Sequence, residues 1–310
     1  MLLPIVVAVL VLLLILFAVF FFRKAFRRPR SADLLNRDER MSSELFSYAE
    51  VLEPALAWFR AQAWEEVLLD AADGCRLKGL WLSGTGKNCL LLFHGYGGLP
   101  QNMCVIAREA AKRGWSLLLP YSRAHGESGG DYCSLGVLEA EDCCRWARLA
   151  ADRCTGGRLV VYGAGMNGFA VLCTAGKELP PETAALVSEG AYGSQKKILR
   201  HVLRKELRMR TFPLLQLLLL FGHIVWKQSP GSVDLQGILQ KHTALPILFI
   251  HGKKDRRVPC AMTEELYKAY GGKKALYLAE NAGHAAASLS ESDKFFGELW
   301  KFLSPITKQT

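Results

Sequence analysis

Short apolar runs recur along the chain, and segments with apolar residues at helical spacing separate them. The runs NCLLLFHG, WSLLLP, RLVVYG, AALVSEG, PILFIHG and ALYLA indicate buried strands, because each is short and bounded by turn residues. Segments such as MCVIAREAAKRG and DKFFGELWKFL indicate amphipathic helices. Strands that alternate with helices predict a single α/β domain over residues 65–310, with a mainly parallel sheet covered by helices on both faces.

Three stretches depart from this alternation. Residues 31–64 are rich in helix formers and predict a helical lead-in, and EEVLLDAADGCRLKGLWL reads as two strands joined by a turn at Asp73-Gly74. Residues 194–240 hold a basic segment, expected to be helical over 196–210, and the apolar run FPLLQLLLLFGHIVW, which is short for a membrane span. We expect this stretch to form a short helical cap.

The N-terminal segment has a different pattern again. Residues 2–22 carry no charge and are long enough to cross a hydrocarbon core of about 30 Å. A signal peptide is the alternative, but it would need a charged start, a shorter apolar core and a small-residue cleavage site. The run instead ends in FFF and a basic cluster, RKAFRRPR. We therefore predict that residues 1–30 form an uncleaved transmembrane anchor with a basic flank.

Charge adds a prediction about location and partners. Half of the 310 residues are hydrophobic and the formal net charge is +10, with the excess in the basic flank and in the run 196–210. Such runs suit anionic lipid or nucleic acid. Because the first run adjoins a membrane span, we expect contact with the membrane through residues 2–22 and the run 196–210, and no nucleic acid. An ordinary solvated face is the alternative for the second run. The positive-inside rule predicts a single-pass protein of the cell membrane whose domain faces the cytoplasm.

The stretch VVYGAGMNGFAVL combines a strand, a glycine turn and a helix, and two chemistries use this layout. Gly163, Gly165 and Gly168 match the dinucleotide fingerprint G-x-G-x-x-G, with Glu189 near where an acidic residue would bind a ribose. The nucleophile elbow G-x-S-x-G of hydrolases has the same layout and would place a serine at residue 165. Apart from the first alternative we expect no cofactor, and no metal site, because the cysteines and histidines lack metal-ligand spacing.

The hydrolase interpretation predicts further groups, and the chain has them in the required order. The glycine-rich turn HGYGG follows an upstream strand and leaves backbone N–H groups free to face an oxyanion. Asp255 follows the strand PILFI, and His284 follows the strand ALYLA. The order elbow, Asp, His along the chain is the one that this fold requires.

Together these motifs resemble those of the α/β-hydrolases over about residues 40–304. The resemblance rests on LLLFHGYGG, RAHGESGGDY, VVYGAGMNG, VSEGAY, PILFIHGKKDRRVP and AGH, and points to membrane-anchored bacterial members related to serine esterases and peptidases. It implies that Asp255 and His284 are the acid and base of a catalytic triad and that Gly165 occupies the nucleophile position. It also implies an oxyanion hole made by the backbone N–H groups of Tyr96 and Met166.

The implied nucleophile is missing. Where the family motif resembles YG-x-SMG, this chain reads YGAGMN, so Gly165 stands in place of the serine and Asn167 in place of the later glycine. Without a hydroxyl at residue 165 no acyl-enzyme can form there. Asn167 is also a poor fit, because helix and strand pass closely at that point.

Three hypotheses for function remain open. The first is a catalytically degenerate relative of serine hydrolases that binds a small acyl or peptide-like ligand, or a partner. The second is an active ester or amide hydrolase that uses water activated by His284, or a relocated nucleophile. The candidates for the relocated nucleophile are Cys173, Ser122, Ser128 and Ser188. The third is a dinucleotide-binding protein that uses GAGMNG.

Overall fold

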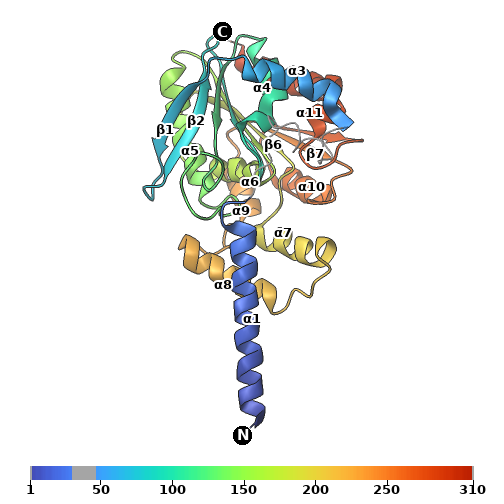
Figure 1. Cartoon of the computed structure of the whole chain (residues 1–310). Helices are drawn as coiled ribbons and strands as arrows, with labels where there is room; N and C mark the ends of the chain where they lie inside the picture. The colour runs from blue at the N-terminus through green and yellow to red at the C-terminus, as the bar shows by residue number, and fades with distance from the viewer. Residues whose placement is uncertain (1, 30–46, 309–310) are drawn as a thin grey trace.

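The computed structural model of the protein describes residues 2–29 and 47–308, and its centre is an eight-stranded sheet (Figure 1). The strand order is β1-β2-β4-β3-β5-β6-β7-β8, in which β2 runs antiparallel to both neighbours and the other pairs are parallel. This arrangement confirms the predicted mainly parallel sheet. The strands are β1 (Glu65–Asp70), β2 (Arg76–Leu82), β3 (Cys89–Phe93), β4 (Ser116–Pro120), β5 (Leu159–Ala164), β6 (Thr183–Glu189), β7 (Ile247–Gly252) and β8 (Lys274–Ala279).

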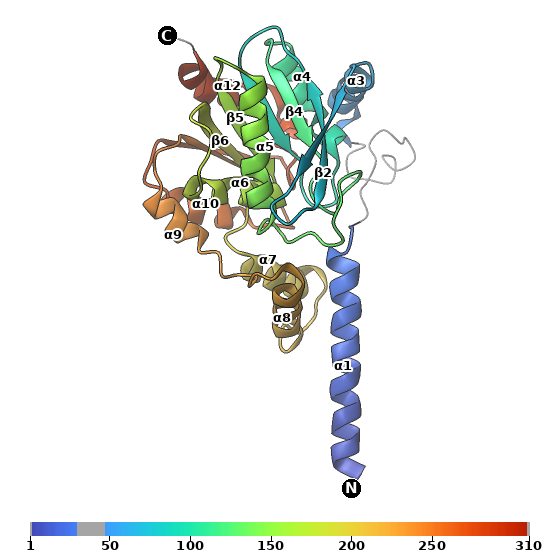
Figure 2. The ribbon, with the colours of Figure 1, turned by 90° about the vertical axis from the view of Figure 1, so that its left-hand side faces the viewer.

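Helices cover both faces of the sheet (Figure 2). One face carries α3 (Ala49–Arg60), α4 (Cys104–Ala111), α11 (Ala287–Ser290) and α12 (Ser292–Thr307), and the other carries α5 (Glu139–Arg153), α6 (Met166–Cys173), α9 (Leu235–Lys241) and α10 (Cys260–Ala269). The central strands feed both cores, because successive side chains point to opposite faces. In β3, Leu90 and Leu92 enter the first core, whereas Leu91 and Phe93 enter the second.

The first two strands form the predicted hairpin. β1 pairs with β2 from Glu65 opposite Trp81 to Asp70 opposite Arg76, and Gly74 in the turn takes a φ of +77° that favours glycine. Of the helical lead-in predicted for 31–64, α3 is the described part, and residues 31–46 lie outside the described residues.

The insertion between β6 and β7 contains α7 (Gln195–His201), a π-helical turn η4 (Val202–Glu206), α8 (Leu214–Trp226) and α9. The prediction of one helix over 196–210 was wrong after Glu206. The helix ends there because Leu207 N–H closes a wide turn on the carbonyl of Val202, and Arg208 then adopts a φ of +53° that no right-handed helix allows. Helices α7 and α8 lie at the end of the domain from which the N-terminal helix leaves (Figure 1).

The N-terminal helix α1 (Leu2–Phe26) has 25 residues and projects away from the domain; its length and composition would let it cross a membrane. Most of its apolar side chains are exposed, but Ala18, Phe22 and Phe26 are buried. Their spacing of four residues places them on one stripe. The stripe packs on α8, where the Phe22 ring lies 6.1 Å from the ring of Phe221 and 5.8 Å from that of Trp226.

The end of α1 is also attached to the loop that follows β4. The Arg28 guanidinium donates to three carbonyl oxygens of the turn 126–130, at 2.8, 3.0 and 3.1 Å. Backbone bonds of 3.0 Å join Arg28 N to Asp131 O and Cys133 N to Phe26 O. The last turn of the helix is therefore part of the domain, whereas residues 2–13 are exposed.

Candidate functional site

The turn between β5 and α6 has the sharp geometry of a nucleophile elbow. Gly165 adopts φ +54° and ψ −112°, and its N–H donates to the carbonyl of Glu189 at 2.7 Å. The neighbouring glycines are required by close packing. A Cβ atom on Gly163 would lie 2.2 Å from the carbonyl oxygen of Asn167, and one on Gly168 would lie 2.8 Å from that of Glu189. Packing of helix on strand therefore accounts for Gly163 and Gly168, two of the three fingerprint glycines, without a nucleotide.

Asp255 and His284 lie in contact with each other beside the elbow. Asp255 lies in the turn after β7 and His284 in the turn after β8, so the carboxyl ends of neighbouring parallel strands bring them together. The Asp255 carboxylate accepts a hydrogen bond of 2.7 Å from Nδ1 of His284. This bond fixes the ring so that Nε2 faces residue 165.

The carboxylate of Asp255 is held on every side. Its Oδ1 accepts backbone N–H bonds from Arg257 at 2.8 Å and Val258 at 2.9 Å, while Oδ2 contacts both His284 and Nε2 of His251, the latter at 3.2 Å. Burial opposes the charge, but the hydrogen bonds from His251, His284 and the backbone hold the pKa of Asp255 well below its usual range. Asp255 is therefore an anion at neutral pH.

Gly165 lies directly against the base. A Cβ atom at residue 165 would be 3.0 Å from Nε2 of His284 and 3.4 Å from its Cε1. In the described part of the chain the His284 ring forms a single hydrogen bond, the one to Asp255. The structure therefore brings together a base, its carboxylate and an elbow whose central residue has no side chain.

The candidates for a relocated nucleophile have other roles. Ser122 accepts a bond of 2.7 Å from the Asn167 amide, and Ser128 donates to the carbonyl of Tyr121 at 2.7 Å. Ser188 donates to Gly168 O at 3.0 Å. Burial raises the pKa of Cys173 above its ordinary value, so its thiolate is disfavoured. We find none of these four bonded to His284 within residues 2–29 and 47–308.

Asn167 is fully buried at the start of α6, and its side chain crosses to two loops. Its amide nitrogen donates to the carbonyl of His94 and to Oγ of Ser122. Its amide oxygen is buried with no protein partner in the described residues. The space that a glycine would leave is thus filled by a polar bridge between the elbow helix and the loops after β3 and β4.

The loop after β3 carries the predicted oxyanion donors. His94 donates from Nδ1 to Gly95 O at 2.8 Å and accepts from Ser122 N at 3.1 Å. Burial, together with the nearby His125, lowers the pKa of His94 to about 3, so the ring is neutral. His125 accepts from Gly97 N at 3.0 Å, which joins the loop to the turn after β4.

Tyr96 and Met166, whose N–H groups are the predicted donors, both line the cavity beside His284. Met166 is the first residue of α6, so its N–H has no acceptor inside the helix. Tyr96 stands on the opposite loop and donates its hydroxyl to the carbonyl of Ala25, at the end of α1. Burial raises the pKa of Tyr96, which keeps that hydroxyl protonated.

A cavity of about 390 Å³ opens beside His284. Its volume lies in the usual range for small-molecule sites. Three parts of the molecule line it: the segments that follow the carboxyl ends of the strands, the cap between β6 and β7, and the last turns of α1. The segments after the strands contribute Tyr96, Met166 and His284. The cap contributes Val202, Leu203 and Glu206, and α1 contributes Phe21, Ala25 and Phe26.

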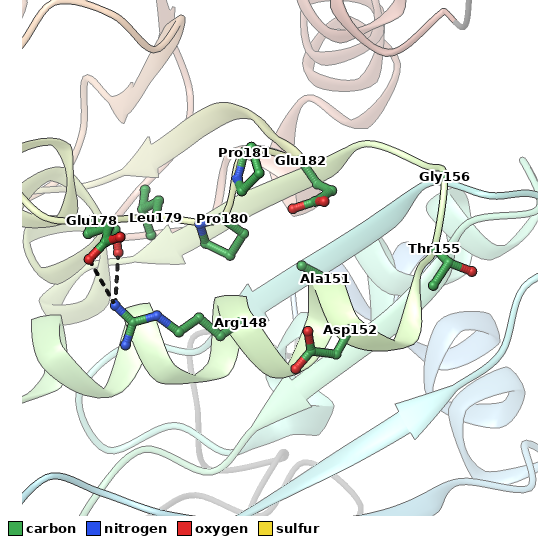
Figure 3. A pocket seen from close by; sticks show the side chains of 10 residues that line it. All are labelled: Arg148, Ala151, Asp152, Thr155, Gly156, Glu178, Leu179, Pro180, Pro181 and Glu182. Carbon is green, nitrogen blue, oxygen red and sulfur yellow. Dashed lines mark hydrogen bonds and ion pairs between the residues drawn. The ribbon is translucent and has the colours of Figure 1, made fainter.

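A second hollow of about 590 Å³ is larger but lies at the far ends of α5 and β6 (Figure 3). It is open and lined by charged side chains, including the ion pair of Arg148 and Glu178 at 4.0 Å. It contains no histidine, serine or cysteine. The cavity beside His284 is therefore the candidate site, in spite of its smaller volume.

Three features shape this site in ways that the sequence patterns did not predict. His251, at the end of β7, contacts the carboxylate of Asp255 and is hydrogen-bonded at Nδ1 to the hydroxyl of Thr263 at 2.7 Å. Glu189 accepts from Tyr162 at 2.6 Å and from Ala287 N at 3.1 Å, and so supports the loop that carries His284. The third is the wall formed by α1. The position of His251 at the end of a buried strand was the signal available for that residue. Nothing in the hydrophobic pattern indicated that α1 forms a wall of the cavity.

The strand order, the elbow and the position of the Asp255–His284 pair are those of the α/β-hydrolase fold, and solved structures show the same fold. The Pyrococcus furiosus esterase Pf2001 matches with a TM-score of 0.67 at 16% identity, covering 92% of this chain and 98% of that one. A bacterial membrane phospholipase A, described as a virulence factor, matches with a TM-score of 0.58 at 21% identity, covering 84% of this chain and 93% of its own.

Two curated sequences are also similar to the chain. The uncharacterized protein YqkD of Bacillus subtilis is 24% identical over 286 residues, which is 92% of this chain and 90% of YqkD. The uncharacterized protein YfhR of Escherichia coli K12 is 23% identical over 230 residues, or 72% of this chain and 74% of YfhR. No protein-family model matches the chain.

Proposed function

We propose that this α/β-hydrolase-fold protein binds an acyl ligand at a membrane surface without turning it over through an acyl-enzyme. The observation that carries the proposal is Gly165, which stands against Nε2 of His284 where a nucleophile would be needed. Serine hydrolysis begins with attack by a hydroxyl at this point, and the residual rate without it is small. The remaining donors, Tyr96 N–H and Met166 N–H, would bind the carbonyl or carboxylate oxygen of the ligand.

A second candidate function is hydrolysis by a water molecule that His284 activates. The intact hydrogen bond between His284 and Asp255 favours it, because a histidine with a fixed tautomer and a free Nε2 is suited to general-base catalysis. The two candidates differ in one respect that can be measured: only the second predicts ester turnover that depends on His284.

The test uses the full-length protein in detergent micelles, a fluorophosphonate probe and p-nitrophenyl esters of short and medium acyl chains. We expect no labelling, and the same background turnover for the parent and for His284→Ala. Labelling would contradict the proposal outright. Turnover that falls when His284 is replaced, in a protein that the probe does not label, would establish the second candidate instead.

We also propose that the domain faces the cytoplasm and that the cap lies against the membrane. Helix α8 exposes Leu220 and Ile224, which are 50% and 63% accessible, next to the anchor, and Phe212 before it is 74% accessible. Apolar side chains flanked by a basic run suit the boundary between headgroups and acyl chains. Protease treatment of spheroplasts would test the orientation, since a cytoplasmic domain stays protected until the membrane is opened.

A further inference from the structure

The cavity beside His284 has an unusual wall, because part of it belongs to the segment that could span the membrane. Phe21, Ala25 and Phe26 of α1 line the same space as His284. We infer that the cavity receives one fatty-acyl chain of a membrane lipid, which enters from the bilayer along α1 and places its carbonyl or carboxylate end at His284. This inference rests on the proposed function and deepens it by naming the ligand class and its route.

The height of the cavity relative to the bilayer supports this route. The uncharged run ends at Phe22, and Arg23 and Lys24 follow it. Basic residues at this point belong at the headgroup level. Phe21 and Ala25 therefore lie at the boundary of the hydrocarbon, and Trp226 of α8 packs against Phe22 at the same level. The residues of α1 that line the cavity are thus continuous, along one helix, with the segment that would lie in the hydrocarbon.

The lining of the cavity is apolar at one end and has hydrogen-bonding groups at the other, which matches the chain and the carbonyl end of an acyl ligand. The walls contributed by α1 and the cap are mainly aliphatic and aromatic, and the charged side chains Glu206 and Arg257 are exposed. The hydrogen-bonding groups gather at the other end, at His284 and at the N–H groups of Tyr96 and Met166. A peptide would need partners for its backbone along its whole length. The distribution of polar groups therefore favours an acyl chain over a peptide.

Tyr96 gives the anchor a second connection to this site. Its hydroxyl donates to Ala25 O on α1, while its backbone belongs to the loop with the predicted oxyanion donors. One residue thus joins the apolar wall to the polar end of the cavity. The anchor is in this sense a component of the binding site as well as a membrane tether.

The experiment uses the full-length protein in lipid nanodiscs that contain a diazirine-bearing acyl chain, supplied as a free fatty acid, a lysophospholipid or a two-chain phospholipid. After illumination, mass spectrometry locates the cross-links. We expect cross-links on the cap segment 198–207 as well as on the outer face of α1. The probe that gives the most cap cross-links identifies the headgroup.

Variants that fill the cavity provide the comparison. Ala25→Trp fills it from the anchor and Val202→Trp fills it from the cap, so that either one serves if the other does not fold. Both should lower cap cross-linking about tenfold or more, because the indole side chain would occupy the space that the ligand needs. The matched control is Ala8→Trp, on the exposed part of the same helix, which should leave cap cross-linking unchanged.

Cross-links confined to the outer face of residues 2–16 would overturn the inference, and so would an equal effect of all three substitutions. These results are distinguishable from failure of the proposed function. Turnover of esters would show that the protein is an enzyme, and cross-linking of the cap would still report whether a lipid chain occupies the cavity.

Discussion

The candidate site has two halves that differ in completeness: the acid–base pair of Asp255 and His284, and the elbow at Gly165. The acid–base half is complete: Asp255 receives two backbone N–H groups and two histidines, and it fixes His284 at 2.7 Å. The elbow half has the backbone of an elbow, with φ +54° at Gly165, but residue 165 carries no hydroxyl and Asn167 lies at the start of the helix behind it. The difference teaches that the elbow backbone and an Asp–His pair can be present together without the reactive atom. Asp255 also holds the turn 257–258, so its retention has a structural reason that needs no catalysis.

Restoring the serine is the change with the largest expected effect. Gly165→Ser returns a hydroxyl to an elbow that already has the required backbone, opposite an oriented base. We expect fluorophosphonate labelling to appear and ester turnover to rise by at least about a hundredfold, since loss of the nucleophile costs a triad far more than that. The new Cβ would lie 3.0 Å from Nε2 of His284, so the ring must shift by a few tenths of an ångström.

The matched controls are Gly165→Ala, which adds the same Cβ without the hydroxyl, and the double variant Gly165→Ser/His284→Ala. Neither should gain activity. If Gly165→Ser folds and stays inert, the elbow half has changed beyond its missing atom, and Asn167 becomes the first residue to examine.

Removing the carboxylate charge tests the other half. Asp255→Asn should lower the free energy of unfolding at pH 7 by about 2–3 kcal/mol, because hydrogen bonds to a buried charged group are the stronger ones. Chemical denaturation followed by Trp fluorescence measures the difference. His284→Ala, which leaves Asp255 with His251 and its backbone donors, should cost less. Equal losses would show that His284, and not the turn 257–258, is what the carboxylate stabilises.

The pH dependence of that difference has a definite sign. The pKa of Asp255 is lower in the folded protein than its ordinary value of 3.8, so the folded state releases this proton more readily than the unfolded chain. The stabilisation is therefore complete above about pH 4 and is lost as the pH falls below the unfolded pKa. The stability gap between the parent and Asp255→Asn should shrink on acidification. A gap that widens would contradict the assigned charge.

Sequence patterns predicted the sheet and much of the site because each rests on local rules. Buried strands are short apolar runs, the hairpin has its Asp73-Gly74 turn, and the groups of a hydrolase site follow particular strands in a particular order. These rules placed Gly165, Asp255 and His284 near one another before any distance was known. The prediction of a helix over 196–210 was wrong at its end, because that end depends on a wide turn at Leu207 and on the conformation of Arg208.

The remaining features depend on contacts between distant segments. Ala18, Phe22 and Phe26 look like any other residues of an apolar helix, and only the fold shows that they pack on the cap. The participation of α1 in the cavity follows from where the cap places α8, and hydrophobic periodicity carries no information about that. The bridging role of Asn167 likewise depends on two loops that come from other strands.

Asn167 permits a sharper comparison inside the elbow half. Asn167→Gly restores the small residue but removes two buried hydrogen bonds and adds a glycine to a helix. We expect the free energy of unfolding to fall by about 1–2 kcal/mol. Ser122→Ala, which removes one acceptor of the same amide, should cost less. In the Gly165→Ser background, a further gain in turnover would identify Asn167 as an obstacle to catalysis; a loss would identify it as a support for the loops.

The smallest expected effect concerns the link between the oxyanion loop, which follows β3, and the anchor. Tyr96→Phe removes the hydroxyl that donates to Ala25 O and keeps the backbone N–H. Stability should fall by about 1 kcal/mol or less, the net worth of one neutral hydrogen bond. In the Gly165→Ser background turnover should fall by no more than about tenfold, because removing an oxyanion donor altogether lowers rates by about a hundredfold or more. The control is Tyr132→Phe, whose ring contacts Phe22 at 5.6 Å, outside the oxyanion loop. An equal fall in turnover for both variants would place the effect in the packing of α1; a fall for Tyr96→Phe alone would show that the anchor positions the oxyanion loop.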